Sequence, residues 1–173
     1  HKESDFYIIT ASGPANLNTT PLQSAWSDIQ CCVVLLKQAG WPNNIEFLAD
    51  IWGSVALMLG RAKEALPAAK EAAAARPSLE VVQRNLEILA VHEGDNESAL
   101  EANERRAESA DRTFSRISIL HQARKYHACL ATIEAECELL PKMHERYPVS
   151  LVLGVLAAEH LLFKDRAEAL LAQ

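Results

Sequence analysis

Three histidines and a cysteine in the C-terminal half of the chain come closest to the composition of a metal site. They are His121, His127, Cys129 and His144. Imidazole and thiolate groups are the ligands that zinc prefers in proteins. The spacing is irregular, however, and the sequence has neither a Cys-x-x-Cys pair nor two histidines four residues apart. We therefore expect no bound metal and no cofactor.

Other catalytic patterns are also missing from the sequence. It contains no motif for a nucleophilic triad, for a glycine-rich phosphate loop or for a pair of catalytic carboxylates. Residues 104–112, ERRAESADR, form a mixed charge run that we interpret as a solvated helix face. Glu101 and Arg105 are four residues apart, a spacing that allows a favourable ion pair on a helix. We therefore expect that the chain is not an enzyme.

Composition and charge limit the class of protein further. The 173 residues are 49% hydrophobic, poor in aromatic residues and rich in alanine, which favours a helical domain with a real core. A net charge of −6 argues against nucleic acid and anionic membranes as partners. The longest apolar run, residues 31–36, is far below the roughly 20 residues of a membrane helix. Four cysteines without a disulfide pattern indicate a reduced, cytoplasmic protein.

One short pattern recurs four times in the sequence. Its copies are LGRAKEAL from Leu59, EGDNESAL from Glu93, ARKYHACL from Ala123 and FKDRAEAL from Phe163. Each has a polar turn followed by a small residue and a leucine, or by cysteine and leucine in the third copy. The copies begin 34, 30 and 40 residues apart. A period near 34 is typical of stacked helix–turn–helix units, which need at least three copies to bury a core.

The elements between these turns can be read from their start and stop signals. Residues 1–20 form an extended N-terminal segment with strand-like DFYIIT at 5–10. A leading helix over 21–39 begins after Thr20 and stops at Gly40, and Asn43 with Glu46 opens the next helix. The helical domain spans residues 21–173. After the leading helix, the same signals predict four helix pairs. Their ranges are about 45–77, 79–109, 110–141 and 149–173.

The first of these units carries a well-known set of large and small residues. They are Trp52, Gly53, Gly60, Ala65, Ala72 and Pro77. On these residues the chain resembles the tetratricopeptide repeat family, over roughly residues 45–173. The other units match more loosely. Glu87 and Ile117 replace small residues, Asp111 replaces the proline, and the fourth unit offers Leu156, Ala157 and Ala169. The resemblance implies an all-α fold, a right-handed superhelix of stacked antiparallel helix pairs with about nine helices.

The resemblance also implies where a partner would bind. In the family, the first helices of the pairs line a concave groove that holds a peptide or partner segment. The positions carried over for the site are Arg84, Asn85, Ile88, Phe114, Ser118 and His121. In the fourth unit, the groove positions are Leu151, Val155, Ala158 and Leu161. The guanidinium of Arg84 and the amide of Asn85 could hold a carboxylate or a peptide backbone, unless both are simply solvated. Asp50 argues against the subgroup that clamps a C-terminal carboxylate.

Two functions remain open on the sequence alone. The first is a protein–protein interaction scaffold, and the second is an accessory domain of a larger enzyme whose catalytic domain lies outside this chain. Residues 1–20 could also lie in the groove of the same chain. A homodimer could form through the terminal repeat, where Leu170 and Leu171 are apolar. Cys129, at the small position of its unit, should be buried and unreactive.

Overall fold

The computed structural model describes residues 19–42, 45–136 and 147–172, and over these ranges the chain is helical with no strand. The nine helices of this part of the chain are α2 (Thr19–Gln38), α3 (Glu46–Met58), α4 (Ala62–Ala75), α5 (Glu80–His92), α6 (Asn96–Glu104), α7 (Ala110–Gln122), α8 (Tyr126–Glu136), α9 (Tyr147–His160) and α10 (Lys164–Leu171). The predicted all-α class is therefore confirmed. The strand-like residues 5–10, the N-cap Asn43 and His144 lie outside the described residues.

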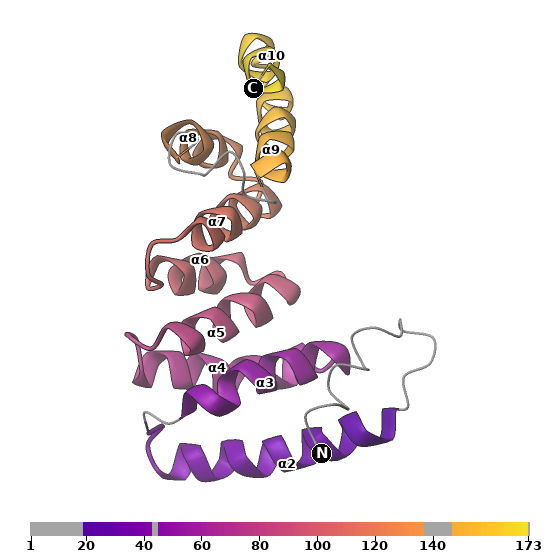
Figure 1. The fold of residues 1–173 in the computed structure, drawn as a ribbon, viewed down its shortest axis with the longest axis vertical. Coiled ribbons are helices and arrows are strands. Elements are labelled where there is room, and N and C mark those ends of the chain that lie inside the picture. Colours follow the sequence, from indigo (N-terminus) through magenta and orange to yellow (C-terminus); the bar gives the residue numbers. More distant parts are fainter. Residues whose placement is uncertain (1–18, 43–44, 137–146, 173) are drawn as a thin grey trace.

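The helices follow one another along the longest axis of the molecule, from α2 at one end to α9 and α10 at the other (Figure 1). Each helix packs against the next one in the sequence, while α3 also packs on α5 and α7 on α9. We call α3, α5, α7 and α9 the A helices, and α4, α6, α8 and α10 the B helices. Neighbouring antiparallel pairs of this kind bury apolar stripes that one pair alone would leave exposed.

All four A helices end in the same type of turn. The turn residue has a left-handed backbone, with φ of 65° at Gly60, 74° at Gly94, 57° at Arg124 and 60° at Leu162. The N–H of the following residue donates to a carbonyl five positions back, as Arg61 does to Ala56 at 2.7 Å. This hydrogen bond satisfies a carbonyl that the end of the helix would otherwise leave unpaired. Glycine adopts this conformation freely, whereas a residue with a Cβ atom loses about 1 kcal/mol or more.

These turns correct the register of the fourth unit. Five positions after each turn residue lies a small buried residue of the B helix, namely Ala65, Ala99, Cys129 and Ala167. Ala169, which we expected at this position, is exposed. The eight-residue pattern aligns the four copies on their last two residues, a small residue and a leucine. In the fourth unit this alignment lies two residues too late, because the turn residue there is Leu162. The true steps between turn residues are 34, 30 and 38.

Two hydrophobic cores occupy the described part of the molecule, and α7 contributes to both. The first core includes Trp26, Trp41 and Trp52 and extends to Ile119. The second includes Leu130 and other residues of α8, α9 and α10, together with Ile117 and Leu120 of α7. Successive helical residues are rotated by about 100°, so residues two apart lie on nearly opposite sides of α7. No helix of the described ranges is both long and apolar enough to cross a membrane.

Candidate functional site

The A helices carry exposed or half-buried side chains at matching positions. Counting back 13, 10, 6 and 2 positions from the turn residue gives four places on one side of each helix, because they are three or four residues apart. The described members are Ser54 and Met58 on α3; Val81, Arg84, Ile88 and His92 on α5; Asp111, Phe114, Ser118 and Gln122 on α7; and Val149, Val152, Leu156 and His160 on α9. None of these side chains is buried. We call this set the A-helix face.

Contacts between the A helices bring the parts of this face together. Gly53 of α3 lies against Asn85 of α5. The N-terminal ends of α5 and α7 line one pocket, and at their C-terminal ends Gln122 donates to the carbonyl of Val91 at 3.3 Å. The two helices therefore run in the same direction. The next step, from α7 to α9, is made by direct packing of the two helices.

Most of the residues expected at the binding site lie on or beside this face. Arg84 is exposed, Ile88 is 39% exposed, and Phe114 and Ser118 are half-buried. His121 lies one position from the face and is half-buried, with its Nε2 atom sealed from solvent and without a hydrogen-bond partner among the described residues.

Asn85 is placed differently from our expectation. Its side chain is only 5% exposed and lies over Gly53, so close that a Cβ atom on Gly53 would overlap the Asn85 amide oxygen. A residue that fills the contact between two packed helices is not available to a partner. Asn85 is therefore not part of the candidate site.

The fourth unit of the site also changes with the corrected register. Ala158 is buried in the second core, and Leu151, Val155 and Leu161 pack against that core, so these positions face the interior of the molecule. The residues that match Val81, Arg84 and Ile88 of α5 are instead Val149, Val152 and Leu156. All three are exposed and apolar. The α9 part of the A-helix face is therefore hydrophobic.

A pocket of about 430 Å³ opens at the α5–α7 part of the face. Its lining comes from the start of α5 and from the α6–α7 loop with the start of α7: Leu79, Glu80, Val81, Arg84, Arg106, Ser109 and Asp111. Leu79 stands at the N-cap position of α5. Its side chain cannot accept a hydrogen bond from the N–H groups in the first turn of that helix. The pocket thus has an apolar wall, a free helix end and several charges.

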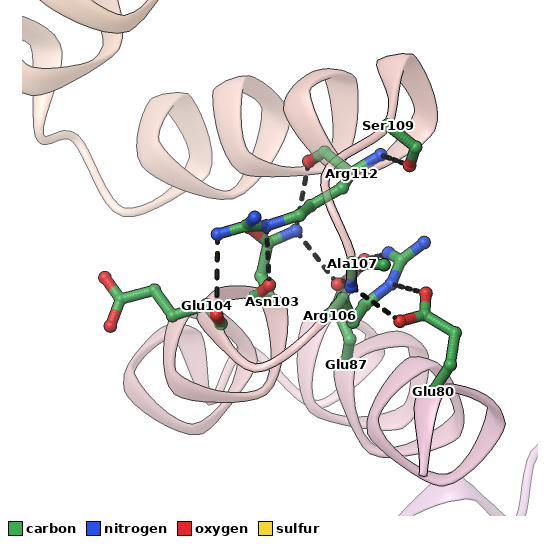
Figure 2. Close-up of polar contacts among 8 residues, drawn as sticks. All are labelled: Glu80, Glu87, Asn103, Glu104, Arg106, Ala107, Ser109 and Arg112. Carbon is green, nitrogen blue, oxygen red and sulfur yellow. Dashed lines mark hydrogen bonds and ion pairs between the residues drawn. The ribbon is translucent and has the colours of Figure 1, made fainter. Parts of the chain in front are cut away.

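Arg106 is a lining residue of this pocket. It joins two glutamates of α5 (Figure 2). Its Nε donates to Glu80 at 2.9 Å, and its Nη1 donates to Glu87 at 2.8 Å. The side chains of Arg106 and Glu87 are 6% and 4% exposed. The exposed face predicted for residues 104–112 is therefore wrong at Arg106. The charged Glu87 at a position expected to be small was the signal that a buried counter-charge had to exist.

The pKa values follow from these contacts. Burial alone would raise the pKa of Glu80, but hydrogen bonds from Arg106 and from the N–H of Ala107 outweigh it, so this pKa lies below its usual value. Burial would lower the pKa of Arg106, and the carboxylates of Glu87 and Glu80 raise it instead. Glu80 and Arg106 therefore both stay charged near neutral pH.

A second set of contacts fixes the α6–α7 loop beside the pocket. Asn103 donates to the carbonyl of Arg112 at 3.0 Å, and the Arg112 Nε donates to the carbonyl of Asn103 at 2.9 Å (Figure 2). Ser109 caps α7 by accepting from the N–H of Arg112 at 3.2 Å. The loop that carries Ser109 is therefore held by hydrogen bonds to the end of α6 and to the start of α7. This side of the pocket is formed without a ligand.

The residues that resembled a metal site have other surroundings. Tyr126 is stacked on His160, with 4.4 Å between the ring centroids, and meets the ring of His121 edge-on at 5.6 Å. Cys129 is buried as predicted, and burial raises the pKa of its thiol to about 11. The described residues contain no group of three or more His, Cys, Asp or Glu side chains that could hold a metal ion.

Comparisons of the chain with protein-family models, curated proteins and solved structures found no match. The helical array and its exposed face therefore carry the functional argument.

Proposed function

We propose that this chain is a protein-interaction module that holds a partner segment against the A-helix face. The observation that carries the proposal is the recurrence of exposed or half-buried side chains at the same turn-relative positions on successive A helices. Five of these side chains are exposed as well as large and apolar: Met58, Ile88, Val149, Val152 and Leu156. Exposed apolar residues that gather on one face are typical of surfaces that bind other proteins.

We also propose that the helix pairs form a right-handed superhelix similar to that of tetratricopeptide repeats, with the A helices on its inner side. Support comes from the packing of each helix on the next, from the shared turns, and from the small residues where A and B helices meet. Such an arrangement would give the A-helix face the curvature of a groove. The proposed role is binding, and we assign no catalytic residue.

Site-specific photo-crosslinking in cells tests the proposed function. A photoreactive phenylalanine analogue would replace Ile88, Ser118 or Val152 on the face, and Lys63 on the outer side of α4 as the control. We expect the same crosslinked partner protein from the three face positions and none from the control position. Equal crosslinking from Lys63, or no crosslinks to another protein from any face position, would contradict the proposal.

A further inference from the structure

The charges around the α5–α7 pocket are mostly satisfied by one another. Arg106 is bonded to Glu80 and Glu87, and the remaining oxygen of Glu80 accepts the N–H of Ala107 at 2.8 Å. Arg112 acts favourably on Glu80 through space. Glu80, Glu87 and Arg106 are therefore occupied by one another and by the backbone of Ala107.

Arg84 is the cation of this pocket that remains available. Its side chain is exposed, and it makes no hydrogen bond or ion pair with another described residue. It stands beside the apolar wall of Leu79 and Val81, one helical turn from the exposed Ile88. A guanidinium has a planar fork of donors that matches a carboxylate with two parallel hydrogen bonds.

We infer that the partner segment places an acidic side chain, Asp or Glu, on Arg84 and an apolar side chain beside it against Val81 and Ile88. This inference rests on the proposed function, since it names the chemistry of the segment that the A-helix face would bind. The acidic residue is internal to the segment. The face continues beyond Arg84 on both sides, to Met58 of α3 and to Ser118 of α7, so the bound chain passes through the pocket.

Asp111 sets a limit on the charge of this ligand. Its exposed carboxylate lines the same pocket, in the first turn of α7. A single carboxylate on Arg84 tolerates this neighbour, whereas a group with two negative charges is repelled more strongly. Removing the charge of Asp111 should therefore strengthen the binding of an acidic segment, and removing that of Arg84 should weaken it. The two variants have opposite expected signs.

A displayed library of random twelve-residue peptides, fused through their C-termini, tests the inference because it offers acidic side chains but no free C-terminal carboxylate. The best selected peptide is then made with an acetylated N-terminus and an amidated C-terminus. Its affinity is measured for the wild type and for the Arg84→Gln, Asp111→Asn and Ile88→Asp variants. Arg166→Gln, on α10 and away from the face, is the matched arginine control. Circular dichroism confirms that each variant is folded.

We expect Asp or Glu to be enriched in the selected peptides. Arg84→Gln should weaken binding about tenfold, the loss of one charge-assisted bidentate contact. Asp111→Asn should tighten binding about two- to threefold, and Arg166→Gln should leave it unchanged. Replacing the acidic residue of the peptide by its amide should weaken binding to the wild type but not to Arg84→Gln.

The possible failures separate the inference from the proposed function. One outcome would overturn the inference and leave the face as the binding site. In that outcome the selected peptides show no preference for Asp or Glu, and their binding is lost in Ile88→Asp but unchanged in Arg84→Gln. If no peptide is selected, or if none of the face variants affects binding, the proposed function itself is contradicted.

Discussion

Arg106 is the residue on which the middle of the molecule depends most. It follows α6, yet its side chain reaches back along α5 to contact both Glu80 and Glu87, which are two helical turns apart (Figure 2). Buried charges are tolerated only when they are paired and hydrogen-bonded, and here Nε and Nη1 of Arg106 each have a carboxylate partner. The network stabilises the junction of α5, α6 and α7, and its members Glu80 and Arg106 line the pocket.

Removal of one partner from this network should be costly. Arg106→Met would leave Glu87 buried without its counter-charge, and we expect a loss of about 3 kcal/mol in the free energy of unfolding. Glu80→Gln affects a carboxylate that is half-exposed and should lose less than about 1 kcal/mol. In urea unfolding, Glu87→Leu/Arg106→Leu should lose less than Arg106→Met alone. A double variant that loses as much stability as Arg106→Met, or more, would contradict this account.

His121 should make the stability of the molecule depend on pH. Burial, and secondarily the nearby His160, lowers its pKa below the usual 6.5, and no carboxylate of the described residues offsets this. The unfolded chain therefore binds a proton that the folded chain excludes, so the stability from neutral His121 is complete above about pH 6.5 and falls as the pH drops below it.

Chemical unfolding between pH 7.5 and 5 measures this effect. We expect His121→Gln to reduce the loss of stability on acidification, while His127→Gln, which removes an exposed imidazole of α8, should leave that loss in place. The same acid sensitivity in the wild type and in His121→Gln would show that other groups cause it.

At the scale of the elements, neighbouring helices are joined by different chemistry in successive units. α3 meets α5 at a glycine, with Asn85 placed over Gly53. In the next unit the position that matches Gly53 is Glu87, and charge pairing with Arg106 replaces close packing. In the third unit Ile117 takes that position and is buried in the second core. The turns are kept, while the contacts between helices vary.

A double-mutant cycle tests the contact between α3 and α5. Gly53→Ala would drive a methyl group into the Asn85 side chain, and we expect a loss of about 1–3 kcal/mol from overpacking. In an Asn85→Ala background the space is vacated, and Gly53→Ala should become neutral or stabilising because alanine is the better helix former by about 1 kcal/mol. Thermal or urea unfolding of the four proteins gives the coupling. Equal effects in both backgrounds would mean that Asn85 is not the obstacle.

At the scale of the whole molecule, α7 connects the two cores. Ile119 belongs to the first core, while Ile117 and Leu120 belong to the second. Leu100 of α6 also packs against both cores, so we expect stability lost in one core to be passed to the other through α6 and α7. The three tryptophans of the chain, Trp26, Trp41 and Trp52, all lie in the first core, so their fluorescence reports on that half alone.

This distribution allows a test of cooperativity. Ile133→Ala removes a fully buried side chain of the second core and should lose about 2–5 kcal/mol. If α7 couples the cores, the tryptophan fluorescence transition should shift as far as the transition followed by circular dichroism. A fluorescence transition that keeps its wild-type midpoint would show that the two cores unfold independently.

The sequence by itself determined the helices and their turns. Gly40, Gly60 and Gly94 mark left-handed helix ends because only glycine adopts that backbone without strain, and Asp95 and Ser109 cap the helices that follow. Where Leu162 takes the turn position, this local signal is absent, and the repeat was aligned two residues late. Local chemistry thus predicts an element only where a residue has a strong intrinsic preference.

Tertiary structure alone decided which side chains are exposed. Arg84 and Asn85 are neighbours in the sequence, yet one lies in an open pocket and the other covers a glycine of α3. Arg106 looked solvated in a mixed charge run, and its burial depends on glutamates of another helix. The exposure of a side chain depends on the helix packed against it, and that neighbour is set by the folding of distant residues rather than by local sequence.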